Sequence, residues 1–256
     1  DIYKYIKDNK KIDGYKLNDV AKIILNDTKD DLTPKELFEK YEGNASDRAI
    51  IAKYCIQDCI LINRIFDKEK VYKNNSAISN VCKVTFVYII ERGQGVKSLA
   101  LVAGQCMKEN YLLPDIETTN DDNSKYEGAI VLEPKTGIYT KSPVVVFDFA
   151  SLYPSSIIEK NLSPDTYIYE KTDEIMNNDN IEIQDINLSS TDANQIGSFV
   201  KYKNGKMGIV PKILKMLLDE RNNAKKLKAN SNNETEQNIY DALQNAYKLT
   251  ANSLYG

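Results

Sequence analysis

The sequence predicts an α/β chain, of one or two domains by its length, in which helices occupy both ends and strands lie between them. Three observations support this class. Residues 1–70 carry apolar side chains at helical spacing, residues 144–147 form an apolar run typical of a buried strand, and residues 211–254 show two further helical patterns. With 256 residues, of which 42% are hydrophobic, the chain can bury a sizeable core.

Composition narrows the classes of function. The net charge is −3, so any contact with nucleic acid must come from local patches rather than from a generally basic surface. The chain contains no histidine, which excludes a Ser-His-Asp triad, a His-liganded zinc site and an imidazole general base within it. Carboxylates that bind hard cations remain the available metal chemistry.

The cysteines and the N-terminal residues indicate the cellular compartment of the protein. Cys55, Cys59, Cys82 and Cys106 lack zinc-knuckle spacing, and we expect reduced, buried thiols in an intracellular protein. No apolar stretch is long enough to span a membrane, and the first residues do not resemble a signal peptide. Because the chain starts without Met and stops directly after a motif, we interpret it as an internal segment of a longer protein.

The first 70 residues are expected to be helical. Residues 17–25 have helical spacing, and Thr33 is a predicted N-cap before Pro34 at the first position of the next helix. A longer helix is predicted over residues 46–66. Its expected apolar face consists of Ala49, Ile50, Ala52, Lys53, Ile56, Ile60 and Leu61.

The middle of the chain alternates between structured and polar segments. After a break at residues 91–95, a helix is predicted over residues 96–109. Strands and one helix are expected within residues 126–170. Residues 171–195, rich in Asp, Asn and Ser, are predicted to be an exposed excursion. Residues 199–206 have the pattern of a hairpin that turns at Asn-Gly, and a polar turn at residues 229–233 separates the last two helices.

The strongest functional signal follows the apolar run at residues 144–147. Asp148 comes directly after this predicted strand, a tight turn follows, and Pro154 occupies the expected first helical position. Such a turn places a carboxylate beside the free N–H groups of residues 151–153, and this combination can hold a divalent metal together with a polyphosphate. The alternative is an acidic strand end that only caps a helix.

Two motifs connect the chain to a known family. Residues 148–155, D-F-A-S-L-Y-P-S, match motif A (D-x-x-S-L-Y-P-S) of family B DNA polymerases at every fixed position, and residues 248–256, K-L-T-A-N-S-L-Y-G, resemble motif B (K-x-x-x-N-S-x-Y-G). Gln244, Lys248 and Asn252 share one helical face. Motif B by itself is also compatible with an ordinary amphipathic helix, but beside motif A the polymerase interpretation is favoured.

This resemblance covers essentially the whole chain and implies its division. Residues 1–70 would end an RNase H-like 3′–5′ exonuclease domain, and residues 71–125 would be a connecting segment. Residues 126–200 would begin the polymerase palm, and residues 201–256 would be the two-helix fingers. Segments such as residues 52–59 are most similar to polymerases of large eukaryotic DNA viruses, followed by delta-like cellular polymerases.

For motif A, the resemblance implies DNA-directed DNA synthesis, in which two Mg²⁺ ions assist nucleotide transfer from a dNTP to a primer 3′-hydroxyl during replication. Asp148 would bind both ions, and the backbone carbonyl of Phe149 would bind the ion on the triphosphate. The triphosphate would lie against the N–H groups of Ser151, Leu152 and Tyr153. The ring of Tyr153 would exclude a ribose 2′-hydroxyl.

For the fingers, the resemblance implies a set of cations on two helices. Lys248 would stabilise the charge that develops at the α-phosphate and donate a proton to the departing pyrophosphate. Arg221 and Lys225 would hold the β- and γ-phosphates, and Asn252 would belong to the same nucleotide site. Arg221 and Lys225 alone would more often be a solvated charge run; the family-like entry G-I-V-P-K-I-L at residues 208–214 favours the fingers.

DNA contacts are implied at two further places. Residues 126–129, Y-E-G-A, resemble the Y-x-G-[GA] element, through which Tyr126 and Gly128 would contact the template backbone. A plain turn before a strand is the alternative there. Tyr255 and Gly256, at the end of motif B, would also bind DNA.

Tyr54 and Asp58 match the Exo III motif (Y-x-x-x-D) of the proofreading exonuclease. Asp58 would help to hold the metal ions and Tyr54 would orient the attacking water. This spacing is a weak signal alone, and its place before motif A strengthens it. Because the family's motif C and two earlier exonuclease motifs are not within these residues, we expect the isolated segment to be inactive in both reactions.

The implied partners are primer–template DNA and dNTPs, without a membrane; a processivity factor is allowed but not identified. A viral origin would leave the host nucleus and the cytoplasm equally open. Two alternatives are a catalytically inactive polymerase relative that only binds nucleic acid or partner proteins, and a stand-alone exonuclease. Intact Asp148, Lys248 and Asn252 argue against the first, and motifs A and B argue against the second.

Overall fold

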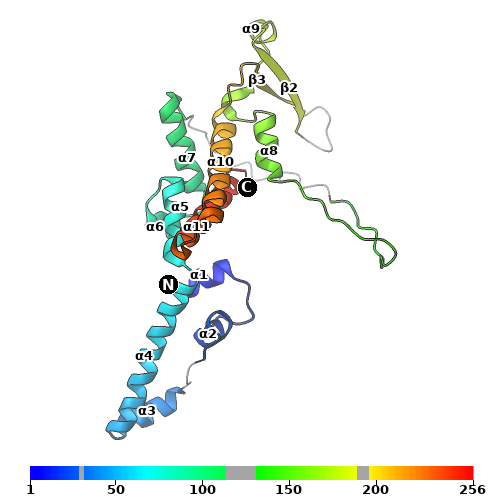
Figure 1. The fold of residues 1–256 in the computed structure, drawn as a ribbon. Coiled ribbons are helices and arrows are strands. Elements are labelled where there is room, and N and C mark those ends of the chain that lie inside the picture. The colour runs from blue at the N-terminus through cyan, green and yellow to red at the C-terminus, as the bar shows by residue number, and fades with distance from the viewer. Residues whose placement is uncertain (29–31, 114–130, 189–195, 256) are drawn as a thin grey trace. The chain divides into compact units, whose positions relative to one another are not determined.

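The computed structural model describes residues 1–28, 32–113, 131–188 and 196–255, and the chain divides into two compact units, Asp1–Ser76 and Ala77–Gly256 (Figure 1). The expected mixture of helices and strands is confirmed. Among the described residues, no helix combines the length and apolarity needed to cross a bilayer. The first unit contains α1 (Ile2–Asn9), α2 (Leu17–Leu25), α3 (Pro34–Glu42) and α4 (Ala45–Lys68), and α5 (Val71–Cys82) continues into the second.

The first unit packs short helices against α4. Its core consists of Ile6, Val20, Ala21, Leu61 and Ile65. The predicted N-cap is confirmed, because the Thr33 hydroxyl accepts a hydrogen bond from Glu36 N–H while the Glu36 carboxylate accepts one from Thr33 N–H.

The predicted apolar face of α4 is largely wrong. Leu61 is buried, but Ile50, Ile56 and Ile60 are exposed. The physical reason is length, since α2 and α3 have nine residues each and cannot cover both sides of a 24-residue helix. Helical spacing alone did not show which side would be covered.

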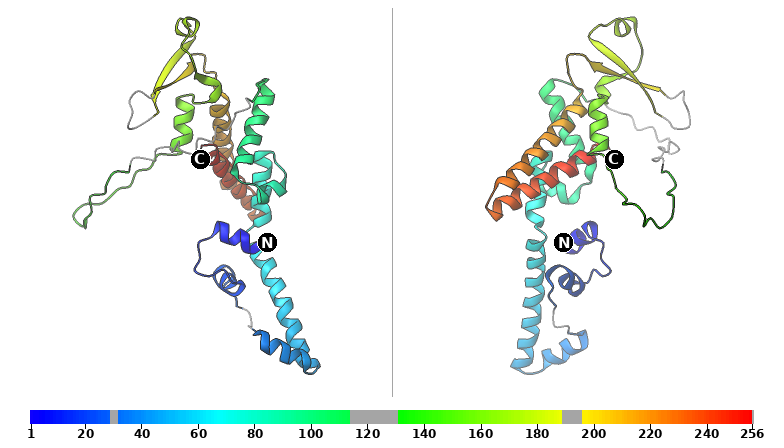
Figure 2. Two further views of the ribbon diagram at one scale, coloured as in Figure 1. Left: turned by 180° about the vertical axis from the view of Figure 1, so that it is seen from behind. Right: turned by 45° about the vertical axis from the view of Figure 1, so that its right-hand side comes forward.

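The second unit is organised around two antiparallel helices, α10 (Ile209–Asn230) and α11 (Glu234–Ser253), which lie side by side in every view (Figures 1 and 2). Both were predicted. Ala242, Ala246 and Ala251 of α11 are buried in the core, and their small side chains allow α10 to approach closely. The other elements of this unit are α6 (Phe86–Glu91), α7 (Gln94–Glu109), α8 (Leu152–Glu159), η1 (Pro164–Thr166) and α9 (Asp173–Met176).

A three-stranded antiparallel sheet completes the second unit. β3 (Ile196–Tyr202) lies between β1 (Tyr167–Ile168) and β2 (Ile181–Asn187). The predicted hairpin at residues 199–206 is wrong, because the chain enters α10 after the turn. Gly205 has a positive φ of 78° but Asn204 does not, so the type I′ geometry that reverses a strand is absent. β3 instead pairs with β1 and β2, and β2 lies within a segment expected to be an exposed excursion.

The strand predicted over residues 144–147 is also absent. All four side chains are exposed, Phe147 at 91%, and no strand of the described chain pairs with them. A strand needs a neighbour to accept its backbone hydrogen bonds and a second layer to cover its apolar face. The segment is apolar, but within the described residues it has neither a neighbouring strand nor a covering layer.

All four cysteines are free, in agreement with the expectation of reduced thiols. Cys82 and Cys106 are buried as predicted, whereas Cys55 and Cys59 are exposed on α4. The expectation of burial is therefore wrong for this pair. The reason is again the uncovered side of α4, on which both thiols lie among exposed isoleucines.

Candidate functional site

The turn after Asp148 leads into α8, which begins at Leu152, so Pro154 is its third residue rather than its first as predicted. Ser151 precedes the helix in the left-handed conformation, with φ of 53°, and its side chain makes no capping hydrogen bond. The first N–H groups of α8 are therefore not used by a side-chain cap and remain suited to an anion. Asp148 and Phe149 lie on the exposed segment before this turn.

The structure brings the two predicted motifs into contact. The ring of Tyr153, in the first turn of α8, stacks on the ring of Tyr255 with centroids 4.9 Å apart and an interplanar angle of 11°. The Tyr255 hydroxyl donates to Asn252 Oδ1 at 3.0 Å. Burial, and secondly the neighbouring Tyr153, raise the pKa of Tyr255, so this hydroxyl stays protonated near neutral pH. The stack therefore limits where the exposed edge of Tyr153 can point.

Contacts from α7 and α5 hold the end of α11. The Ser98 hydroxyl donates to the backbone carbonyl of Ser253 at 3.0 Å, which satisfies a carbonyl in the last turn of the helix. Cys82 Sγ lies 3.4 Å from Thr250 Oγ1 in the core. Burial lowers the pKa of Lys97, which is only 7% exposed. No local pattern indicates these contacts, because the partners lie more than 150 residues apart in the sequence.

A polar joint fixes the start of α10. The Asn161 side chain donates to the Val200 carbonyl at 2.7 Å and accepts from Gly208 N–H at 2.8 Å. The Asp165 carboxylate accepts a hydrogen bond from Ile209 N–H at 3.1 Å, where the helix dipole favours a negative charge. No local sequence pattern indicates this joint, which links β3 and η1 to α10.

Gly208 has no room for a side chain in this joint. A Cβ atom there would lie 2.7 Å from Ser163 Cβ and 2.8 Å from Thr166 Cγ2. We therefore expect Gly208→Ala to lower the free energy of unfolding by about 1–3 kcal/mol, the usual cost of overpacking. Denaturant titration followed by circular dichroism measures this change.

The matched control for that variant is Gly104→Ala in the interior of α7. No atom lies within 4 Å of a Cβ built at Gly104, and alanine favours a helix over glycine by roughly 0.5–1 kcal/mol. This variant should be neutral or stabilising. Equal effects of the two substitutions would contradict the assigned packing of Gly208.

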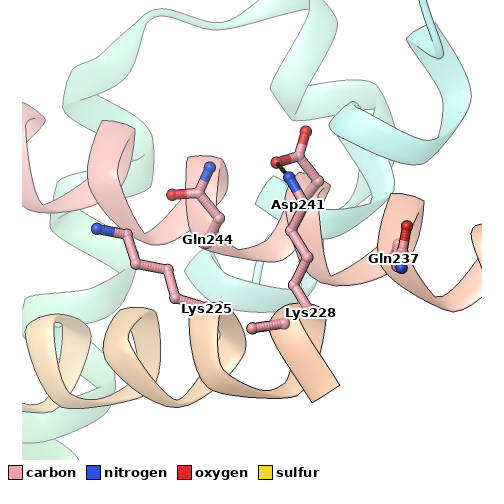
Figure 3. Close-up of a pocket in the computed structure, with 6 residues that line it drawn as sticks. Lys225, Lys228, Gln237, Asp241 and Gln244 are labelled. Atoms are coloured by element: carbon pink, nitrogen blue, oxygen red, sulfur yellow. Dashed lines mark hydrogen bonds and ion pairs between the residues drawn. The ribbon is translucent and has the colours of Figure 1, made fainter. Parts of the chain in front are cut away.

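One of the predicted cations, Lys225, lines a groove between α10 and α11, together with Lys228, which was not predicted. Lys225 lies beside Gln244, and Lys228 forms an ion pair with Asp241 at 2.5 Å (Figure 3). The helices are antiparallel, so the next turn of each lies in the same direction along the groove. One turn before Lys225 on α10 is Arg221, and one turn after Gln244 on α11 is Lys248. Lys248 is exposed, and Arg221 Nε is buried with no hydrogen-bond partner in the described chain.

The remaining predicted residues are distributed differently. Tyr54 and Asp58 lie one turn apart on α4, half-buried, in the first unit, whereas Asp148 belongs to the second. The described residues contain no cluster of three or more Cys, Asp or Glu that could hold a metal ion. Tyr126, Gly128 and Gly256 lie outside the described residues.

Comparison with known proteins gives consistent matches. Residues 84–256 match the model of DNA polymerase family B. The chain is 38% identical to the DNA polymerase of Paramecium bursaria Chlorella virus NY2A over 100% of its length, and 36% identical to that of Pyramimonas orientalis virus over 89%. It is 34% identical to the DNA polymerase delta catalytic subunit of Plasmodium falciparum over 100% of its length. It spans about a quarter of each relative (28%, 23% and 23%).

Proposed function

This chain belongs to DNA polymerase family B, and from that premise we propose that the full-length protein containing it copies a DNA template by adding dNTPs to a primer 3′-hydroxyl. The observation that carries the proposal is the stack of Tyr153 on Tyr255. It joins the first turn of α8, which can receive phosphates, to the end of the helix that carries Lys248. A nucleotide bound there would contact both motifs at once.

We assign the parts of the chain as follows. Residues 1–70 are the last part of a proofreading exonuclease domain, and residues 71–125 form a connection. Residues 126–200 begin the palm, and residues 201–256 form the fingers. The pairing of α10 with α11 and the separate core of the first unit support this assignment.

The residues around Asp148 suit Mg²⁺ in donor type. A carboxylate and the Phe149 backbone carbonyl are hard oxygen donors, and Mg²⁺ commonly uses one or two carboxylates together with water and substrate phosphates. Both donors belong to an exposed segment that water and a triphosphate can reach. The ions, when bound, lower the charge that builds up on the phosphates and activate the primer hydroxyl.

The protein groups would then each act on a different part of the triphosphate. The N–H groups of Ser151, Leu152 and Tyr153 fix its position at the start of α8. Lys248 neutralises the developing charge and protonates the leaving pyrophosphate. Arg221 and Lys225 hold the β- and γ-phosphates, and Asn252, which accepts the Tyr255 hydrogen bond, sets the far wall of the nucleotide site.

Primer extension by the full-length protein tests the proposal. Extension with dNTPs on a primed template is expected in the presence of Mg²⁺, to be lost with a chelator, and to return when Mg²⁺ is added in excess. An extension rate that does not respond to chelation would contradict the two-metal assignment. Absence of extension under all conditions would overturn the proposed function.

Proofreading is a separate proposal that rests on Tyr54 and Asp58. If Asp58 holds exonuclease metals, Asp58→Ala in the full-length protein should strongly reduce 3′–5′ excision and leave extension largely unchanged, because the two sites lie in different units. Excision and extension rates on the same labelled primer measure both effects. Equal loss of both, in a protein with an unchanged melting temperature, would contradict this assignment.

A further inference from the structure

A cavity of about 440 Å³ lies between α10 and α11 and shares Lys225 with the residues assigned to the nucleotide. Its polar lining comes from both helices: Lys225 and Lys228 on α10, and Gln237, Asp241 and Gln244 on α11 (Figure 3). Ala229 is the apolar residue of the lining. Two cations against one carboxylate leave the lining with a net positive charge. The charged groups of the lining therefore favour a small anion.

The cavity continues the proposed phosphate-binding row. Arg221, Lys225 and Lys228 follow one another at spacings of four and three residues, so they share one face of α10. Lys225 belongs to both the proposed triphosphate site and the cavity. An anion that leaves the β- and γ-phosphate positions therefore meets Lys228 one turn further along the same groove.

The carboxylate of Asp241 would compete with an incoming anion for Lys228. It forms an ion pair with Lys228 at 2.5 Å, and both side chains are partly exposed. Partly exposed ion pairs contribute only about 0–1 kcal/mol to stability, so another anion needs little free energy to replace the carboxylate. Lys225, by contrast, makes no ion pair with another described residue. An incoming phosphate would thus find one available cation and a second one held by a weak partner.

We propose that this cavity is an exit subsite for pyrophosphate, in which Lys228 exchanges Asp241 for the departing product. The proposal rests on the proposed polymerase function. The exchange keeps binding weak, because every contact between Lys228 and pyrophosphate costs the ion pair with Asp241. A product site needs this property, since tight binding would delay release and inhibit the next turnover.

A DNA phosphate backbone is a less suitable occupant. A strand of DNA presents singly charged phosphates along an open path, whereas this cavity is bounded by two helices and lined by only two cations. Pyrophosphate carries several charges on a small volume and can contact Lys225 and Lys228 together. Pyrophosphate would also form at the neighbouring cations of α10, where Arg221 and Lys225 are assigned to the β- and γ-phosphates.

The test uses the full-length protein and inorganic pyrophosphate as the probe. Inhibition constants for pyrophosphate are measured in primer extension with wild type, Lys228→Gln, Asp241→Asn and the double variant. We expect Lys228→Gln to weaken inhibition and Asp241→Asn to strengthen it, each by about two- to fivefold, the range that a partly exposed ion pair supports. The double variant should lose the gain in inhibition of Asp241→Asn, because that gain requires the Lys228 cation.

Two control variants make the same charge changes elsewhere. Lys226→Gln and Glu220→Gln alter exposed residues of α10 that do not line the cavity. Neither should change the inhibition constant beyond about 1.5-fold, because solvent screens such surface charges. The KM for dNTPs should stay unchanged in all variants, since Lys228 lies beyond the residues assigned to the triphosphate.

The outcomes are distinct. Inhibition constants that are equal in wild type, Lys228→Gln and Asp241→Asn would overturn the exit subsite while leaving the polymerase assignment intact. A Lys228→Gln variant that binds primer–template less tightly, with unchanged pyrophosphate inhibition, would assign the cavity to DNA instead and also overturn the proposal. Absence of extension by the wild-type protein would overturn the proposed function and the subsite together.

Discussion

Asp148→Asn in the full-length protein is expected to lower kcat for primer extension about a thousandfold, the upper end of what loss of one electrostatic group costs in an active site. The reason is that the proposed site uses this single carboxylate for both metal ions. The amide keeps the shape of the side chain but removes its charge. Single-turnover extension with saturating dNTP measures the effect, and binding of primer–template should change little.

Glu159→Gln is the matched control for this variant. Glu159 lies at the other end of α8, where its carboxylate forms an exposed ion pair with Lys201 at 2.9 Å. Exposed pairs of this kind contribute about 0–1 kcal/mol, so extension should stay within roughly twofold of wild type. An Asp148→Asn enzyme that retains at least a tenth of wild-type kcat would refute the assigned metal role.

The second large effect concerns the sugar of the nucleotide. Tyr153→Ala is expected to raise incorporation of ribonucleotides relative to deoxyribonucleotides by more than about a hundredfold. A 2′-hydroxyl that overlaps a fixed ring costs up to roughly 3 kcal/mol, which corresponds to this factor. The stack on Tyr255 supplies the rigidity, because the ring cannot turn aside without losing that contact. Competitive incorporation of ribo- and deoxyribonucleotides measures the ratio.

Two variants test whether the ring and its support act as described. Tyr153→Phe keeps the ring and should keep the selectivity. Tyr255→Ala removes the support, so the selectivity should fall to an intermediate value while the Tyr153 ring is still present. A Tyr153→Ala enzyme that is folded and active with an unchanged ribo-to-deoxy ratio would show that Tyr153 is only a packing residue.

Local patterns predicted several elements because the forces involved act within a few residues. The cap at Thr33 depends on neighbours three positions away, and α4, α7, α10 and α11 follow from helical spacing. Strand partners were not predictable in this way. The apolar run at residues 144–147 and the turn at Asn204 were both interpreted as strand features, yet pairing depends on segments that periodicity does not identify.

The sequence by itself determined the family, through motif residues whose order and spacing are specific, and it named Asp148, Tyr153 and Lys248 as candidates. Only the tertiary structure decided that Tyr153 stacks on Tyr255, that Ser98 bonds to the end of α11, and that Asp241 pairs with Lys228. Each of these contacts depends on where the helix pair and the joint at Asn161 place distant side chains. The type of each side chain follows directly from the sequence, whereas contacts between distant side chains result from the packing of the whole unit.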